Sequence, residues 1–192
     1  MEKSLEGTRT EKNLMQSFAG ETQAARRYRI YAKQARVDGY EQIAAFFEET
    51  ANQEDTHSKT FFKLLEGGMV EITASFPAGV MGSTDENLQA AASGENEESL
   101  LLYPQFAAIA EEEGFKKIAS KFKLIATVEA EHEKRYLKLL QNLKEGKVFE
   151  KDEEVIWVCR NCGYHYKGKK GLKVCPVCEH PLAFFEVKAE NY

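Results

Sequence analysis

The sequence predicts a mainly α-helical fold, in which a four-helix bundle with one long crossover precedes a small C-terminal β domain. Three observations support this prediction. Apolar residues recur every three or four positions through four stretches of the chain, as expected for helices with one buried face. A stretch without that repeat, residues 67–83, separates the second helix from the third, and all four cysteines lie near the C-terminus. We therefore expect a bundle domain at residues 1–150 and a four-cysteine domain at residues 151–192.

Capping and turn residues mark the ends of the four helices. Capping boxes, in which Ser, Thr or Asp is followed three residues later by Glu, occur three times: Thr8 with Glu11, Asp38 with Glu41, and Ser83 with Glu86. Gly39 and Gly114 predict the turns inside two helical hairpins, and Gly67-Gly68 predicts the end of the second helix. Pro104 interrupts the third helix, so either a kink or a local π-type bulge is expected there.

The segment 67–83, which contains Pro77 and Gly79, is too long for a tight turn between helices. A helix of about 28 residues is about 42 Å long. The segment can span somewhat more than about 50 Å when extended, so it can run the full length of such a helix. We therefore expect two antiparallel hairpins joined by one long crossover, which is the ferritin-like arrangement.

Seven acidic and histidine residues stand in the apolar repeat where hydrophobic residues are expected: Glu21, Glu54, His57, Glu95, Glu98, Glu129 and His132. Folding each hairpin about its turn brings these residues to a common height in the bundle. Five buried carboxylates without a counter-charge would each cost several kcal/mol, or they would take up protons. A pair of divalent cations is the simplest way to offset that cost.

The spacing of these residues matches a known ligand pattern. Glu and His three residues apart share one helix face, so both side chains of a Glu-x-x-His motif can bind the same site. Carboxylate di-iron and di-manganese bundles use one Glu from each of two helices and a Glu-x-x-His from each of the other two. Here these are Glu21, Glu95, Glu54 with His57, and Glu129 with His132. The donor set suits Fe(II) or Mn(II), although zinc can occupy such a site. A single Glu-x-x-His is more often a solvated helix face, but two aligned copies favour metal binding.

Three further residues lie close to this pattern. Glu98 is a fifth carboxylate, one turn after Glu95, and is either a Glu at the edge of the core or a ligand that joins and leaves as the metal charge changes. Tyr28 and Tyr103 are either core tyrosines with a hydrogen-bonded hydroxyl or residues that orient a ligand carboxylate.

The C-terminal cysteines form two Cys-x-x-Cys pairs separated by 12 residues: Cys159 with Cys162, and Cys175 with Cys178. Four thiolates at this spacing make a tetrahedral site for zinc or a single iron. Short strands are expected at 155–158 and 183–185. A segment of about 40 residues cannot be held together by apolar burial alone, so we expect the metal to stabilise it.

Composition limits the function further. The chain has 192 residues, with 31 acidic against 26 basic residues and no basic tract, so a nucleic-acid partner is not expected. The N-terminus does not resemble a signal sequence, and no apolar run approaches about 18 residues, so no membrane association and a cytoplasmic location are expected. In a reducing compartment the paired cysteines indicate metal rather than disulfides.

Over essentially its whole length the chain resembles the rubrerythrin family, on the strength of these glutamates, histidines and cysteines in this order. The resemblance implies a non-haem di-iron peroxidase that reduces hydrogen peroxide to water and protects anaerobic or microaerophilic cells from oxidative stress. It also implies an iron–tetrathiolate centre at the four cysteines, which relays electrons from a donor such as rubredoxin or an NAD(P)H-dependent reductase. Homodimers or higher homo-oligomers, typically with electrons passing between subunits, are implied as well. Free rubredoxins have a Gly after the last Cys, whereas this chain has Glu179.

The resemblance also implies roles for individual residues. One iron of such a site moves between His57 and Glu98 as its oxidation state changes, and Glu54 and Glu129 bridge the two irons. We predict His57, Glu98, Tyr28 and Tyr103 as the residues that take part in catalysis.

Two other classes of function stay open at this point. The bundle could be a ferroxidase or an iron-storage protein, which should form a closed shell and accumulate many irons per subunit. Alternatively, the four-cysteine domain could be a zinc ribbon that serves as a binding module beside a structural bundle. Colour separates this last case, because an oxidised iron–thiolate centre is red and a zinc centre is colourless.

Overall fold

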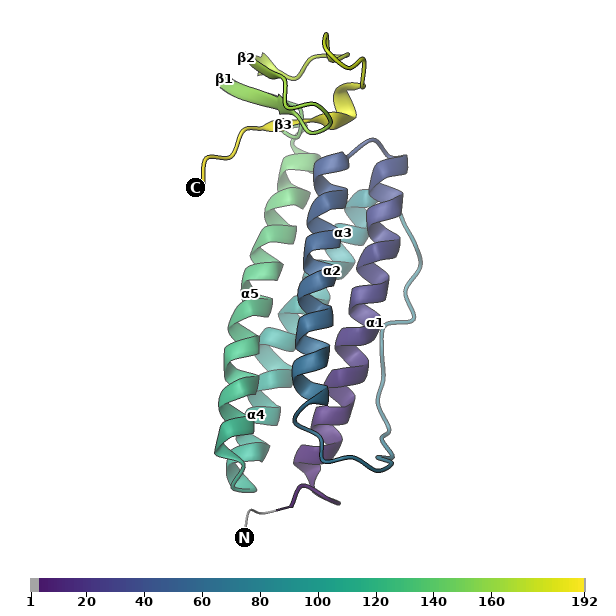
Figure 1. Cartoon of the computed structure of the whole chain (residues 1–192), viewed down its shortest axis with the longest axis vertical. Helices are drawn as coiled ribbons and strands as arrows, with labels where there is room; N and C mark the ends of the chain where they lie inside the picture. Colours follow the sequence, from purple (N-terminus) through teal and green to yellow (C-terminus); the bar gives the residue numbers. More distant parts are fainter. Residues whose placement is uncertain (1–3, 192) are drawn as a thin grey trace.

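The computed structural model describes residues 4–191 and consists of a long helical bundle with a small β domain at one end (Figure 1). The bundle comprises α1 (Arg9–Val37), α2 (Glu41–Phe62), α3 (Thr84–Glu97), the π-helix η1 (Glu98–Leu102), α4 (Tyr103–Glu112) and α5 (Lys116–Lys144). α3, η1 and α4 follow one another directly and together form the third rod of the bundle, so the predicted four-helix bundle with a C-terminal β domain is confirmed. No helix within residues 4–191 is long and apolar enough to cross a membrane.

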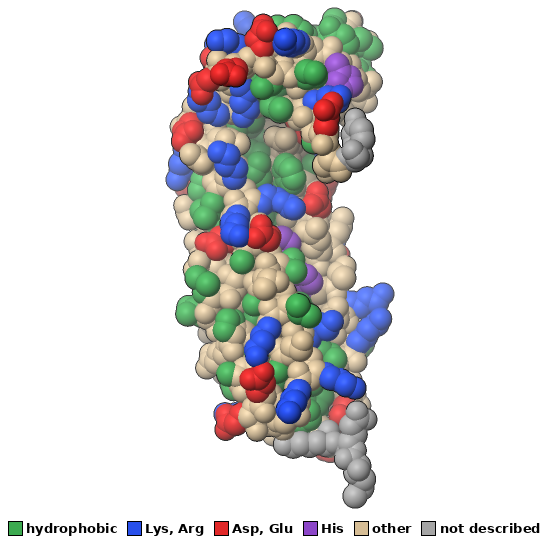
Figure 2. Space-filling view, turned by 90° about the vertical axis from the view of Figure 1, so that its left-hand side faces the viewer, with side chains coloured by type: hydrophobic (Ala, Val, Ile, Leu, Met, Phe, Trp, Pro, Cys, Tyr) green, Lys and Arg blue, Asp and Glu red, His purple; other side chains and the backbone are tan. Residues whose placement is uncertain are grey.

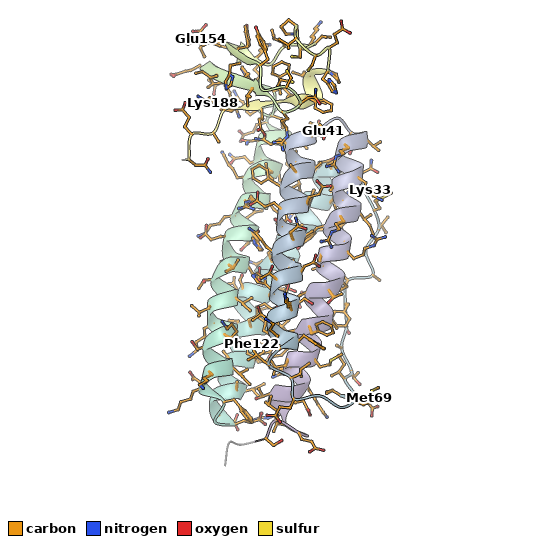
Figure 3. All side chains as sticks on the ribbon, in the orientation of Figure 1. Lys33, Glu41, Met69, Phe122, Glu154 and Lys188 are labelled. Atoms are coloured by element: carbon orange, nitrogen blue, oxygen red, sulfur yellow. The ribbon has the colours of Figure 1, made fainter. Side chains whose placement is uncertain are left out.

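The crossover begins earlier than Gly67-Gly68, where the sequence predicted the end of the second helix. α2 ends at Phe62, because the following turns are closed by hydrogen bonds between residues three apart instead of four. Leu64 N–H, for example, donates to the carbonyl of Phe61 at 3.0 Å. Both glycines have positive φ angles and lie in the loop. The segment then runs along the outside of α1 to the start of α3, as expected, and Figure 3 labels Met69 near its first bend.

Acidic residues in the two hairpin turns cap helices of the opposite hairpin. Asp38 was expected to cap α2, but it is the C-cap of α1, and its carboxylate accepts bonds from Thr84 N (2.9 Å) and Thr84 Oγ1 (2.6 Å) at the start of α3. Glu113, in the turn between α4 and α5, accepts bonds from Thr10 N (2.9 Å) and Thr10 Oγ1 (2.6 Å) in the first turn of α1. The N-terminus of each hairpin is therefore held by the turn of the other.

The predicted capping box at Ser83 and Glu86 is present, and the one at Thr8 and Glu11 is half formed, because the Glu11 carboxylate accepts from Gly7 N instead of Thr8 N. Thr8 Oγ1 accepts a bond from Glu11 N at 3.1 Å at the start of α1. Ser83 N donates to the carboxylate of Glu86 at 2.9 Å at the start of α3. Both helices thus begin where the sequence predicts.

The chain forms a π-helix, η1, just before Pro104, where the sequence predicted either a kink or a π-type bulge. Because Pro104 has no N–H, the regular helical ladder cannot continue to Leu100, and Tyr103 N–H donates to the carbonyl of Glu98, five residues earlier. A π-type bulge, rather than a simple kink, is what the chain forms. It lies where Glu98 and Tyr103 meet the core.

Two apolar clusters fill the bundle, one on each side of the polar residues. The cluster near the β domain contains Tyr28, Phe47 and Tyr136, with the rings of Phe47 and Tyr136 5.2 Å apart. The cluster at the other end contains Phe61 and Phe122, whose rings are 5.1 Å apart; Figure 3 labels Phe122 in that half of the bundle. Packing above and below therefore fixes the helices at the height of the polar site.

The C-terminal domain is an antiparallel sheet of β1 (Glu150–Cys159), β2 (His165–Lys170) and β3 (Phe185–Val187), in the order β2-β1-β3. The predicted strand at 155–158 lies in β1. The strand predicted at 183–185 is mostly wrong, because Leu182–Phe184 is a 3₁₀ turn closed by a bond from Phe184 N to Pro181 O, and β3 begins only at Phe185. Trp157 is fully buried in the small core and donates through Nε1 to the carbonyl of Gly168 at 2.9 Å.

Candidate metal centres

Six of the seven predicted ligand residues meet in the middle of the bundle. They form two groups of four, and within each group the ligand atoms lie within 4.8 Å of one another: Glu21, Glu54, His57 and Glu129 in one, and Glu54, Glu95, Glu129 and His132 in the other. All are buried except His57, whose side chain is 12% exposed. Figure 2 shows histidine side chains at the surface halfway along the bundle. The two groups share Glu54 and Glu129.

The shared carboxylates each reach both histidines. His57 Nδ1 lies 2.8 Å from Glu54 Oε2 and 2.9 Å from Glu129 Oε1. His132 Nδ1 lies 3.1 Å from Glu54 Oε1 and 2.8 Å from Glu129 Oε2. One oxygen of each shared carboxylate thus faces each histidine, which is the arrangement needed to bridge two neighbouring ions.

The hydrogen bonding of these groups fits a pair of cations. Among residues 4–191, the buried oxygens Glu21 Oε2, Glu95 Oε2 and both oxygens of Glu129 have no hydrogen-bond partner of normal geometry. Such atoms would cost free energy in a dry core unless an ion or a proton compensates them. Carboxylates and imidazoles together form the donor set that iron and manganese prefer.

Protons on the cluster residues can also supply positive charge to the buried carboxylates. Burial lowers the pKa of both histidines, but the carboxylates of Glu129 and Glu54 outweigh it and raise the pKa of His57 to about 9 and of His132 to about 12. Burial and the neighbouring Glu54 raise the pKa of Glu95 to about 8. Burial also favours the neutral form of Glu54, yet hydrogen bonds from the two histidines lower its pKa to about 2. These shifts favour protonated side chains at neutral pH, so a metal ion that binds here would displace protons.

Outside the two groups, three side chains form hydrogen bonds with members of the groups. Tyr28 Oη donates to Glu95 Oε1 at 2.5 Å, and Tyr103 Oη donates to Glu21 Oε1. His132 Nε2 lies 2.9 Å from Gln53 Oε1, which turns Nδ1 of that ring toward the carboxylates. The sequence pointed to both tyrosines but not to Gln53, because Gln53 lies beside the apolar stripe of α2 rather than in it.

Glu98 stands apart from the other six. It is half-buried at the start of η1 and belongs to neither group of four. Burial, followed by the charges of Glu95 and Glu129, raises the pKa of Glu98 well above its ordinary value. Together with Tyr103, Glu98 lines a cavity of about 80 Å³. Glu98 is therefore close enough for the charges of the cluster to shift its pKa, but it contributes no ligand atom to either group in this conformation.

The four predicted cysteine ligands meet in the C-terminal domain as unpaired thiols within 4.8 Å of one another. The sulfurs of Cys159 and Cys178 are 3.7 Å apart, and those of Cys162 and Cys175 are 3.6 Å apart. Cys159 and Cys175 are buried, whereas Cys162 is exposed. These distances are too long for disulfides and fit four thiolates around one ion.

The two cysteine loops have the same backbone hydrogen bonds. Gly163 N donates to Cys159 O at 2.8 Å, and Glu179 N donates to Cys175 O at 3.0 Å. Gly163 has a φ of +75°, and Glu179 has a φ of +60°, so Glu179 adopts the left-handed conformation that glycine accepts more easily. The second loop therefore keeps the geometry of the first, with the side chain of Glu179 making it less favourable.

Comparisons with known proteins give matches to both parts of the chain. The rubrerythrin family model matches residues 12–156, and the model of the rubredoxin-like domain of rubrerythrin matches residues 157–186. Rubrerythrin from Porphyromonas gingivalis is 60% identical over 192 residues, covering 100% of this chain and 96% of that protein. Rubrerythrin from Nitratidesulfovibrio vulgaris is 50% identical over 190 residues, covering 99% of this chain and 100% of that protein. A solved structure of nigerythrin in a fully reduced, all-ferrous state has a TM-score of 0.63 and 33% identity, covering 96% of this chain and 92% of that one.

Proposed function

Because the chain belongs to the rubrerythrin family, a family of di-iron ferritin-like proteins, we propose that it is a non-haem peroxidase that reduces hydrogen peroxide to water. The observation that carries this proposal is the pair of ligand groups that share Glu54 and Glu129. A second metal site of redox type, formed by the four cysteines, supports it further. A storage protein needs no such second centre.

The proposed cofactor of the bundle is two iron ions, one in each group of four ligand residues. The all-ferrous state of nigerythrin supports iron over manganese or zinc. Two iron ions held there would supply the two electrons that cleavage of the O–O bond requires. Glu54 and Glu129 are the proposed bridging ligands, and Glu98 is the proposed ligand that exchanges with His57.

The surrounding residues supply position and protons. Reduction of one hydrogen peroxide to two waters consumes two electrons and two protons. Burial and neighbouring carboxylates raise the pKa of Glu98, which favours its protonated form beside the 80 Å³ cavity, where a substrate oxygen can accept the proton. Tyr28 and Tyr103 hold Glu95 and Glu21 in place, so these carboxylates do not have to reorient during turnover.

The four-cysteine domain is the proposed electron relay, with iron as its metal. The exposed Cys162 brings the centre to the protein surface, where a donor such as rubredoxin or an NAD(P)H-dependent reductase can approach it. We further propose a cytoplasmic homodimer or higher homo-oligomer, as expected from the resemblance.

Metal content and activity together test this function. Protein purified without oxygen should contain three irons per chain, be red when oxidised, and consume hydrogen peroxide when a reductase supplies electrons. A colourless, zinc-loaded cysteine site would contradict the relay. A closed shell that accumulates many irons per subunit would instead indicate iron storage.

Two variants test the roles of single residues. Glu98→Ala should slow peroxide turnover while the far-UV circular dichroism and the iron content stay unchanged; unchanged turnover would refute the role of Glu98. Cys159→Ser should block steady turnover but spare one oxidation of pre-reduced di-iron protein. Continued cycling of that variant would contradict the relay.

A further inference from the structure

A cavity of about 80 Å³ lies between α1, η1 and the crossover, and one of its lining residues, Tyr103, donates a hydrogen bond to Glu21 of the cluster. Glu98 and Tyr103 line it on one side, and Phe76 and Pro77 of the crossover line it on the other. None of its lining residues belongs to α2 or α5, the helices that carry the two histidines. The cavity is therefore separate from the solvent-exposed edge of His57.

Two glycines in the middle of helices form part of the cavity wall. Gly20 lies in α1 and Gly94 in α3, where alanine would stabilise a helix better than glycine. A Cβ added at Gly94 would meet no heavy atom within 4 Å, and one added at Gly20 would meet Phe76 Cε1 at 3.7 Å. Close packing thus does not demand glycine at either position. Because glycine has no side chain, both positions leave open space in the cavity.

The cavity also offers polar partners to a small molecule. Among residues 4–191, the buried Nε of Arg27 has no hydrogen-bond partner. The same guanidinium lies 5.7 Å from the ring centroid of Tyr28, which in turn holds Glu95. A donor at Arg27 and the carboxyl group of Glu98 can together bind a molecule that both donates and accepts hydrogen bonds. A volume of about 80 Å³ limits that molecule to a few heavy atoms.

We propose that this cavity is the chamber through which hydrogen peroxide enters, and that Gly20 and Gly94 keep it open and set the upper size of the substrate. The identity of the substrate rests on the proposed peroxidase function, whereas the entry route does not. Peroxide then reaches the cluster past Glu98, on a different side from the exposed edge of His57. We expect the chamber to admit hydrogen peroxide and to exclude a tertiary alkyl hydroperoxide.

Filling the chamber from Gly94 tests the route. In Gly94→Leu, kcat/KM for hydrogen peroxide should fall about tenfold or more, with unchanged iron content. The matched control is Ser93→Leu, which places the same side chain at the exposed neighbouring position of the same helix. It should leave kcat/KM within about twofold of the unsubstituted protein. Equal losses in both variants would overturn the proposal.

Azide gives a readout that does not depend on turnover. The second-order rate of azide binding to the oxidised, iron-loaded protein, followed by absorbance, should fall with Gly94→Leu and not with Ser93→Leu. An unchanged azide rate in Gly94→Leu would overturn the chamber and indicate entry at the histidine edge. A failure of the proposed peroxidase function would look different. The unsubstituted protein would then bind azide faster than Gly94→Leu does, yet it would not consume hydrogen peroxide.

Gly94→Ala keeps the test decisive if the larger side chain disturbs folding. Alanine should raise the melting temperature by about 2–4 °C, because it replaces glycine inside a helix, and should still lower the azide rate about two- to threefold. A rise in stability with an unchanged azide rate would overturn the proposal.

The size limit is tested with tert-butyl hydroperoxide, which the unsubstituted protein should turn over at least about 100-fold more slowly than hydrogen peroxide. Comparable rates would refute that limit.

Discussion

Loading the bundle site with metal should release protons, and the structure indicates how many. In the metal-free cluster the pKa of His57 is about 9 and that of His132 about 12, so both rings are charged at pH 7. A histidine that binds a metal must be neutral, so two protons must leave. Glu95, with a pKa of about 8, contributes most of a third. Burial and the neighbouring carboxylates also raise the pKa of Glu21, so we expect three or more protons per two ions at pH 7, and an apparent affinity that rises steeply with pH.

The proton count can be measured by titrating Mn(II) into the protein, with the cysteine site already filled, in a calorimeter. Repeating the titration at one pH in buffers of different ionisation enthalpy gives the number of protons released. His57→Ala should release about one proton fewer, whereas His165→Ala, on the exposed surface of β2, should change nothing. Release of less than one proton would refute the reasoning, because the histidines would then be neutral before metal binding or would not be ligands.

The remaining predictions concern stability. Because the pKa of His57 is raised, the folded protein without metal binds more protons than the unfolded chain between pH 6.5 and about 9. Its melting temperature should therefore fall as the pH rises through that window. A melting temperature that does not change with pH there would contradict this prediction. Tyr103→Phe should lower the unfolding free energy of metal-free protein by about 1–3 kcal/mol in denaturant titrations, since a buried carboxylate loses its donor. Glu179→Gly should stabilise the four-cysteine domain by about 1 kcal/mol and slow metal loss to a chelator, with Gly163→Ala acting in the opposite direction; faster loss from Glu179→Gly would count against backbone strain. Asp38→Ala should cost about 1–2 kcal/mol although it lies far from the metal, and a cost near zero would show that its cap is not formed in solution.

The four helices, the crossover and the meeting of the polar residues could be predicted from the sequence because they follow from period and register. A position in the apolar stripe fixes the face of a residue, and distance from a turn fixes its height. Those two quantities bring Glu21 of α1 to Glu54 and His57 of α2 without any knowledge of packing.

What the sequence could not show depends on contacts between distant segments. Asp38 fits a local capping box, yet its carboxylate bonds to Thr84 of the other hairpin, because the end of the crossover brings that helix start beside it. Gln53 lies outside the apolar stripe, and only the rotation of α2 against α5 brings it to His132. Glu98 shares a helix face with Glu95, but the π-helix that starts at Glu98 alters the local geometry, and the residue lies outside both ligand groups.

The exchange of caps between the hairpins makes each half of the bundle incomplete on its own. If the hairpins separated, the first turns of α1 and α3 would each lose the carboxylate that now covers their amides. Each half also carries three of the six clustered ligand residues, so no half-formed cluster can hold both ions. Separation of the hairpins at one end would thus also weaken the cap and the cluster contacts further along. The bundle should therefore melt in a single cooperative transition rather than hairpin by hairpin.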